Sequence, residues 1–359
     1  MQRIGWLDSS RGLAILMLIL IHYVGALESR EIISEDIMLC IKAVLRVATP
    51  FFILIFGFTF YTLFSRKITT LADVYSLYKR LSVKVFYLFL AREFIVLISA
   101  LRFDYTSDYL VSVLLYMDTS IMGEILTFYM IALLVSPIAL YVVKPMRPLW
   151  VLCLSVVIYV FGYSIGSNFE SFRDDILFRL FFYDVYPFFP FYGLVLLGFF
   201  FSKIYSMVLD DKNRFLFFLS VSFISILCAL AILNQYLGDV LRVLADAGLK
   251  SPPSVSYMLL YIGVTVQIVL LNALLIKREL MPNIVSEVLD TIGRNSLLAY
   301  TLHYTLFLPS FILHFVFDSV GKLIEIAAFI LMILFLYSIL VIAERSSTKG
   351  RSNESFGNS

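Results

Sequence analysis

The stretch that decides the fold is residues 8–22, Asp8-Ser-Ser-Arg11-Gly-Leu-Ala-Ile-Leu-Met-Leu-Ile-Leu-Ile-His22. It is an apolar run of helix length that carries a cation near its start and an imidazole at its end. On an α-helix, Arg11 and His22 differ by about 20° around the axis and stand about 16 Å apart along it. Polar side chains placed inside a membrane helix usually serve chemistry or transport. The stretch therefore predicts a membrane-spanning helix with one functional face.

The composition extends this prediction to the whole chain. Hydrophobic residues make up 61% of the 359 positions, charged residues only 15%, and the mean hydropathy is +0.93. Such values are typical of membrane proteins. We expect an all-α, polytopic integral membrane protein with about ten transmembrane helices in one bundle. The net charge of +2 does not indicate a nucleic-acid-binding surface.

Ten apolar windows are long enough to cross a bilayer. They lie near 10–27, 38–64, 83–101, 121–143, 149–166, 186–205, 214–237, 256–276, 295–317 and 323–343. We therefore assign residues 1–344 to one transmembrane domain. Residues 345–359 are polar, and we expect them to form a disordered cytoplasmic tail.

The charges of the segments between the windows predict the orientation of the chain in the membrane. The segment between the second and third windows is rich in cations, whereas residues 28–36 are acidic. Positive residues stay on the cytoplasmic side. Both termini are then cytoplasmic, in a multi-pass protein of the plasma membrane if the source is prokaryotic.

Two motifs point to a family. Arg11, ten residues and His22 resemble the start of the membrane acyltransferases of family 3, and Pro50-Phe-Phe-Ile-Leu-Ile-Phe-Gly57-Phe is similar to their second span. Three further stretches resemble the heparan-alpha-glucosaminide N-acetyltransferase catalytic-domain superfamily. They are Asp184-Val-Tyr-Pro-Phe-Phe-Pro-Phe-Tyr-Gly-Leu-Val-Leu-Leu-Gly198, Lys250-Ser-Pro-Pro-Ser-Val-Ser-Tyr257 and Ile292-Gly-Arg-Asn-Ser-Leu-Leu-Ala-Tyr-Thr-Leu-His303.

The resemblance implies a transmembrane acyltransferase. Such enzymes take an acetyl group from cytosolic acetyl-CoA and deliver it to a sugar on the opposite face, and several use a transmembrane histidine that matches His22. The lysosomal relative has Asn at this position, so the family 3 enzymes are the better guide to mechanism. The implied partners are acetyl-CoA as co-substrate, a glycan or lipid-linked sugar acceptor and the lipid bilayer, with no nucleic acid. Formation of a homo-oligomer stays open.

The residues support this chemistry independently. Attack of a sugar hydroxyl or amine on a thioester needs a base, and a neutral imidazole suits that role. His22 is the first catalytic candidate, either as base or as the nucleophile of an acetyl-histidine intermediate. His303 is the second and is placed to orient substrate or to stabilise the oxyanion. His314 reads as structural, and because it is about 16 Å from His303 along a helix the two do not share a metal. We expect no metal.

Polar residues outside the histidines complete the candidate site. Cations at the cytoplasmic mouth would attract the phosphates of CoA, although the positive-inside rule explains loop cations without any ligand. The cofactor-binding candidates are Arg11, Arg80, Lys84, Arg294, Asn295 and Ser296. The substrate-binding candidates are Asp8, Glu124 and Tyr186. Glu124 belongs with Arg46, Arg92 and Glu93 to the intramembrane charges that either line a reaction chamber or form ion pairs between helices.

A second class of function fits the same buried polar residues. A secondary transporter of lipid-linked sugars or small anions would use them as a midplane site. Transporters of this kind contain internal repeats with broken helices in corresponding positions. We find no convincing self-similarity in the sequence, which favours the enzyme.

Overall fold

The computed structural model describes residues 5–28, 34–103, 105–120, 122–236, 239–246, 248–305 and 322–356. Within these ranges the chain is helical and contains no strand. Eight of the described helical segments are long and apolar enough to cross a membrane. The prediction of an all-α, polytopic membrane protein is confirmed.

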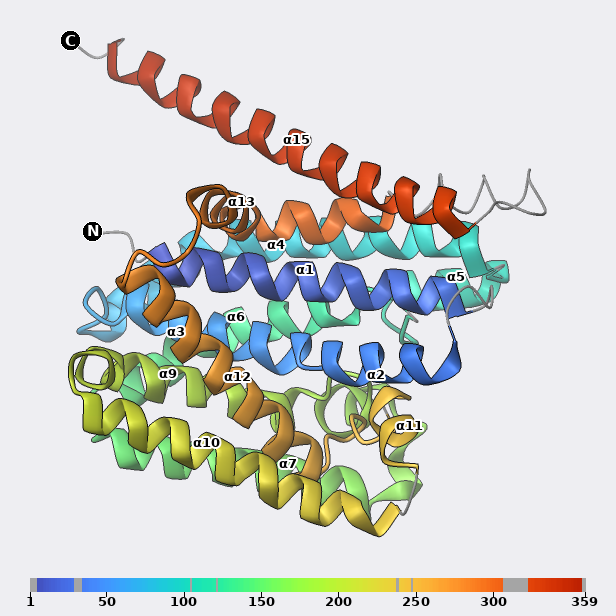
Figure 1. Ribbon diagram of the computed structural model, residues 1–359, viewed down its shortest axis with the longest axis horizontal. Coiled ribbons are helices and arrows are strands. Elements are labelled where there is room, and N and C mark those ends of the chain that lie inside the picture. Colours follow the sequence, from blue (N-terminus) through green and yellow to red (C-terminus); the bar gives the residue numbers. More distant parts are fainter. Residues whose placement is uncertain are drawn as a thin grey trace. The chain divides into compact units, whose positions relative to one another are not determined.

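Apart from residues 283–294, which lie between the eighth and ninth windows, the long helices coincide with the apolar windows of the sequence (Figure 1). They are α1 (Gly5–Glu28), α2 (Glu35–Leu45), α3 (Ala48–Phe64), α4 (Leu71–Phe103), α6 (Glu124–Val143), α7 (Pro148–Asn168), α9 (Phe188–Asp210), α10 (Lys212–Leu233), α12 (Val255–Lys277), α13 (Asn283–Arg294) and α15 (Lys322–Phe356). Shorter helices are α5 (Ser107–Leu114), α8 (Ile176–Phe178) and α11 (Val240–Ala245), with the single turns η1 (Glu170–Phe172), η2 (Arg179–Tyr183) and η3 (Asn234–Tyr236). Residues 296–305 are also helical.

Three of the predicted windows differ from the helices that the structure describes. The third window lies within α4, a helix of 33 residues that begins in the charged connection and is more polar than the eight candidate spans. The ninth window is described only as far as residue 305, and His314 lies outside the described residues. Helix α15 extends past Glu344 into the polar segment for which the sequence predicts a disordered tail.

The second window is interrupted. Helix α2 ends at Leu45 and α3 begins at Ala48, with Arg46 and Val47 in the turn between them. Proline has no N–H, and its ring clashes with the carbonyl of the residue four positions earlier in a continuous helix. Pro50 stands four positions after Arg46, so the helix breaks there. The break gives Arg46 a position in a turn instead of on a helical face.

The chain divides into two compact units. Unit 1 comprises Met1–Met38 and Leu275–Ser359, and unit 2 comprises Leu39–Leu274. In unit 1, α1 packs against α13, which also contacts α15. The glycines at this contact have no room for a side chain, because a Cβ at Gly12 would overlap the carbonyl of Leu289 and one at Gly293 would overlap the carbonyl of Asp8. The α1–α13 contact is therefore made backbone to backbone.

Unit 2 is built around α9, which packs against α3 and α7, while α4 packs against α6. Close approach again depends on glycine, since a Cβ at Gly57 would overlap the carbonyl of Val195. The hydroxyl of Ser155 on α7 donates to the carbonyl of Gly193 on α9 at 2.7 Å. These contacts fix α3 and α7 against α9.

Candidate active site

Two histidines from opposite ends of the chain meet in unit 1. Nδ1 of His22 on α1 lies 2.8 Å from Nε2 of His303 in the helical segment 296–305. Their rings stack with centroids 5.1 Å apart and planes inclined by 13°. His303 is fully buried, whereas His22 is partly exposed. The structure thus brings together the two residues that the sequence nominates for catalysis.

Hydrogen bonding to the backbone sets the tautomers of this pair. Nδ1 of His303 bonds to the carbonyl oxygen of Tyr300, and a carbonyl only accepts, so this nitrogen carries the proton. In a neutral ring Nε2 of His303 is then an acceptor, and Nδ1 of His22 donates to it. Nε2 of His22 therefore carries a lone pair. That nitrogen has the electronic form required of a general base or of a nucleophile.

Two tyrosines complete the surroundings of the histidines. Tyr300, His303 and Tyr304 share one helical face, since positions three and four apart are neighbours on a helix. The Tyr304 ring centroid is 4.1 Å from that of His303 and 5.3 Å from that of His22. The Tyr300 and Tyr304 hydroxyls are 3.2 Å apart. Neither tyrosine is among the site residues predicted from the sequence, although their spacing from His303 was a usable signal.

Arg11 and Asp8 form an ion pair with each other within the first turns of α1. The Asp8 side chain is 9% exposed and that of Arg11 26%. A carboxylate in the first turn also interacts favourably with the helix dipole. Asp8 therefore neutralises much of the charge for which Arg11 was nominated as a CoA ligand.

Arg294, Asn295 and Ser296 mark the passage from α13 to the helical segment 296–305. Nε of Arg294 lies 2.7 Å from a carboxylate oxygen of Glu344 on α15. Asn295 donates through Nδ2 to the carbonyl of Thr291 at 3.0 Å, and Ser296 is partly buried. These contacts serve the packing of unit 1, with Arg294 paired to a carboxylate.

Three of the intramembrane charges of unit 2 form a network. Arg92 is fully buried, and its guanidinium lies 3.0 Å from Glu93 and 3.1 Å from Glu124. It also donates to the carbonyl of Val113 at 2.8 Å, and Glu124 accepts from the Ser120 N–H at 2.9 Å. Of the two alternatives for these charges, the geometry is that of ion pairing between α4 and α6. Glu124 thus neutralises Arg92.

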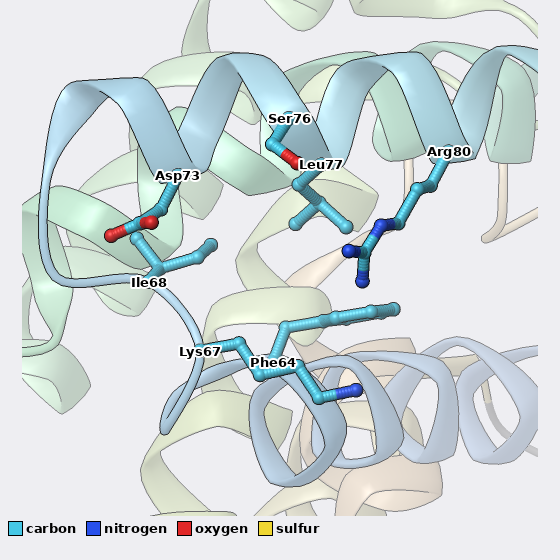
Figure 2. A pocket seen from close by; sticks show the side chains of 7 residues that line it. All are labelled: Phe64, Lys67, Ile68, Asp73, Ser76, Leu77 and Arg80. Atoms are coloured by element: carbon cyan, nitrogen blue, oxygen red, sulfur yellow. The ribbon is translucent and has the colours of Figure 1, made fainter.

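A cavity of about 300 Å³ opens where α3 passes into α4. Its lining combines apolar side chains with two cations: Phe64, Lys67, Ile68, Asp73, Ser76, Leu77 and Arg80. In Figure 2 the Arg80 guanidinium points from α4 toward the ring of Phe64, with Lys67 on the other side of the space. Lys84 is exposed one turn further along α4 and is not part of the lining.

The carboxylate in this cavity is engaged by the backbone. Asp73 accepts from the N–H groups of Thr69 and Thr70 at 2.9 and 2.8 Å and from both of their hydroxyls. The backbone N–H of Thr69 is the largest of the contributions that hold the pKa of Asp73 well below its ordinary value. Lys67 and Arg80 are therefore the charged groups that the cavity offers to a ligand.

The remaining nominated residue, Tyr186, lies just before α9 in unit 2. It is partly buried, and the ammonium of Lys250 sits 3.7 Å from its ring centroid. In the part of the chain that the structure describes, no group of three or more His, Cys, Asp or Glu side chains could hold a metal ion.

Comparison with known proteins identifies the family. The family model described as an acyltransferase domain, that of acyltransferase family 3, matches residues 4–344. No curated protein and no solved structure gives a significant match. The chain belongs to acyltransferase family 3, and together with its apolar helices this makes it a multi-pass membrane acyltransferase.

Proposed function

We propose that the protein transfers an acetyl group from cytosolic acetyl-CoA to a sugar hydroxyl or amine on the opposite side of the membrane. The observation that carries the proposal is the bond between His22 and His303 in a chain of the acyltransferase family. It leaves Nε2 of His22 as a lone-pair donor on a partly exposed ring. A transfer enzyme needs such a group, whereas scaffolding does not.

The reaction follows from these atoms. Nε2 of His22 takes the proton of the attacking hydroxyl or amine while the new bond to the thioester carbonyl forms. The C–S bond then breaks, and the thiolate of CoA receives that proton back from His22. The positive charge that His22 carries between these steps is stabilised because its Nδ1–H donates to His303. Through an acetyl-histidine intermediate the same nitrogen would instead attack the thioester first.

The cavity between α3 and α4 supports the choice of donor. Lys67 and Arg80 would meet the phosphates of CoA, and the apolar wall that includes Phe64 would meet its adenine. The connection that carries these residues has the charge typical of a cytoplasmic loop. A cavity on the cytoplasmic side would be open to cytosolic acetyl-CoA, so the proposed orientation of the chain fits the proposed donor.

The test uses inverted membrane vesicles, whose cytoplasmic face is outside, and acetyl-CoA labelled in the acetyl group. Label should appear in the glycan or lipid fraction of vesicles that contain the protein and not in vesicles that lack it. Alkali-labile label indicates an ester and alkali-stable label an amide. If purified, folded protein neither binds acetyl-CoA nor transfers label, the donor assignment is wrong. Transport of sugar lipids is then the next activity to measure.

A further inference from the structure

A second polar cluster lies in unit 2, where three long helices begin. Arg46 is in the turn before α3, Tyr186 stands before α9 and Lys250 lies in the loop before α12. With Thr49 in the first turn of α3, we call these four residues the anion cluster. Thr49 is buried, three residues after Arg46 in the chain. Lys250 packs on the Tyr186 ring and is only 4% exposed.

The cluster holds two cations and no carboxylate. Among the described residues, neither Arg46 nor Lys250 has a carboxylate oxygen within ion-pair distance. Arg46 donates from Nε and Nη2 to the carbonyl of Ala245, at 3.0 and 2.5 Å, so both bonds go to a neutral acceptor. Buried charges in proteins are normally paired. This contrasts with Arg92 in the same unit, which has two carboxylates beside it.

The groups around the cluster are rich in donors. The hydroxyls of Tyr129 and Tyr257 are buried without a hydrogen-bond partner in the structure. Tyr129 packs edge-on against Phe52, three residues after Thr49. Tyr257 packs edge-on against Tyr261, whose hydroxyl donates to the carbonyl of Ala43, three residues before Arg46. A buried hydroxyl without a partner costs free energy. An acceptor-rich ligand would satisfy the hydroxyls and the cations together.

The position of the cluster separates it from the donor cavity. Arg46 precedes the start of α3 and Phe64 is its last residue, and the 17 residues of α3 correspond to about 26 Å of helix. That is close to the thickness of the hydrocarbon core of a bilayer. If the donor cavity is cytoplasmic, the anion cluster faces the opposite side, where the acceptor is found.

We propose that the anion cluster binds a phosphate or carboxylate group of the acceptor, so that the enzyme acetylates a negatively charged sugar. This inference rests on the proposed function because it assumes an acceptor on that side. Arg46 and Lys250 supply the charge, and the hydroxyls of Thr49 and Tyr186 fix the orientation. Tyr186 is the partly exposed aromatic side chain of the cluster. The shared chemistry is an anionic oxygen group, either the phosphate of a phosphorylated or lipid-linked sugar or the carboxylate of an acidic sugar.

Direct binding to the purified full-length protein tests the inference. The probes are glucose 1-phosphate, glucuronic acid and neutral glucose, and the readout is a saturable shift in thermal unfolding. At least one anionic probe should bind at least tenfold more tightly than glucose, and the anion that binds identifies the source. Equal binding of all three probes, or of none, would overturn the inference on the wild-type protein alone.

Variants locate the binding. Lys250→Met removes the charge at similar length and should reduce binding of the anionic probe at least tenfold, whereas Lys250→Arg should retain most of it. Lys212→Met, an exposed cation at the start of α10, is the matched control and should bind normally. Arg80→Ala separates the two sites, since it should spare binding of the probe while weakening acetyl-CoA. Loss of the probe in Arg80→Ala but not in Lys250→Met would assign the anion to the donor cavity and refute the proposal.

A transfer assay distinguishes the two proposals. Both the proposed function and the anionic acceptor are supported if the wild-type protein transfers label preferentially to the anionic sugar and Lys250→Met loses this preference. Transfer to neutral sugars with no preference leaves the proposed function standing and contradicts the anionic acceptor. Absence of any transfer counts against the proposed function, and the anion cluster is then judged by the direct binding measurements.

Discussion

Nδ1 of His22 lies 2.8 Å from Nε2 of His303, although 281 positions separate the two residues in the chain. The other ring nitrogen of His303, Nδ1, donates a hydrogen bond to the carbonyl oxygen of Tyr300. The positions of the ring protons are therefore set by a chain of hydrogen bonds that runs from the backbone through His303 to His22. This chain of hydrogen bonds makes His303 a positioning residue, because His303 acts on the reaction through His22.

Removing His303 should lower kcat roughly 100-fold while leaving KM for acetyl-CoA within about twofold, because general-base catalysis contributes about that much. His303→Gln should recover a good part of the loss, since its side-chain oxygen offers an acceptor where Nε2 stood. Steady-state kinetics of wild type, His303→Ala and His303→Gln give the comparison. Equal loss in both variants, or a change confined to KM, would show that His303 has no positioning role.

Arg80→Ala should weaken binding of acetyl-CoA about tenfold, because a charge-assisted hydrogen bond to phosphate contributes on the order of 1.5–3 kcal/mol. Lys79→Ala, the neighbouring position on α4 that does not line the cavity, is the matched control and should bind normally. Acetyl-pantetheine lacks the phosphates and should bind equally to all three proteins. The account of the cavity fails if Lys79→Ala and Arg80→Ala weaken binding to the same extent.

Glu124→Gln should destabilise the folded protein by roughly 3 kcal/mol, because it removes one partner of a buried ion pair and leaves the charge of Arg92 buried. Asp211→Asn makes the same chemical change in the exposed pair with Arg214, where both side chains are about half exposed, and should cost about 1 kcal/mol or less. Denaturant unfolding in detergent measures both. Similar losses in the two variants would contradict the role given to the Arg92 network.

Asp73 should make the connection between α3 and α4 sensitive to acid. Its folded-state pKa is lowered, chiefly by the Thr69 backbone N–H, so its contribution to stability is present above the ordinary pKa of about 4 and is lost as the pH falls below it. Asp73→Asn should remove this dependence. The measurement is the rate at which a protease cleaves this connection as the pH is lowered from 6 to 3. The same acid sensitivity in wild type and Asp73→Asn would refute the prediction.

Local patterns were sufficient for most of the long helices, although α13 lies outside the windows. Apolar length predicts a membrane-spanning helix because the hydrocarbon core imposes both composition and length, and α6, α7, α10 and α12 lie within a few residues of their windows. The break at Arg46 was missed, although Pro50 in the quoted motif carried the signal. Its consequence is large, since the break puts Arg46 beside Ala245.

The sequence was enough to nominate the residues of the site but not to show which of them contact one another. His22 and His303 stand out because polar groups in apolar runs are costly and need a reason. Their pairing depends on the close packing of α1 on α13, which rests on Gly12 and Gly293 far apart in sequence. The pair of Asp8 and Arg11 follows from their spacing of three on one helix, whereas nothing local shows that Glu124 pairs with Arg92 and Arg294 with Glu344. That these residues also bind a ligand stays a prediction.

The most direct test of the central claim is transfer of labelled acetyl from acetyl-CoA into the glycan or lipid fraction by vesicles containing His22→Ala. Thermal unfolding and binding of acetyl-CoA should match wild type, because Nε2 of His22 acts on the proton of the acceptor and not on the donor's phosphates. We predict that transfer falls at least 100-fold. Transfer at the wild-type rate in folded His22→Ala protein would contradict the account.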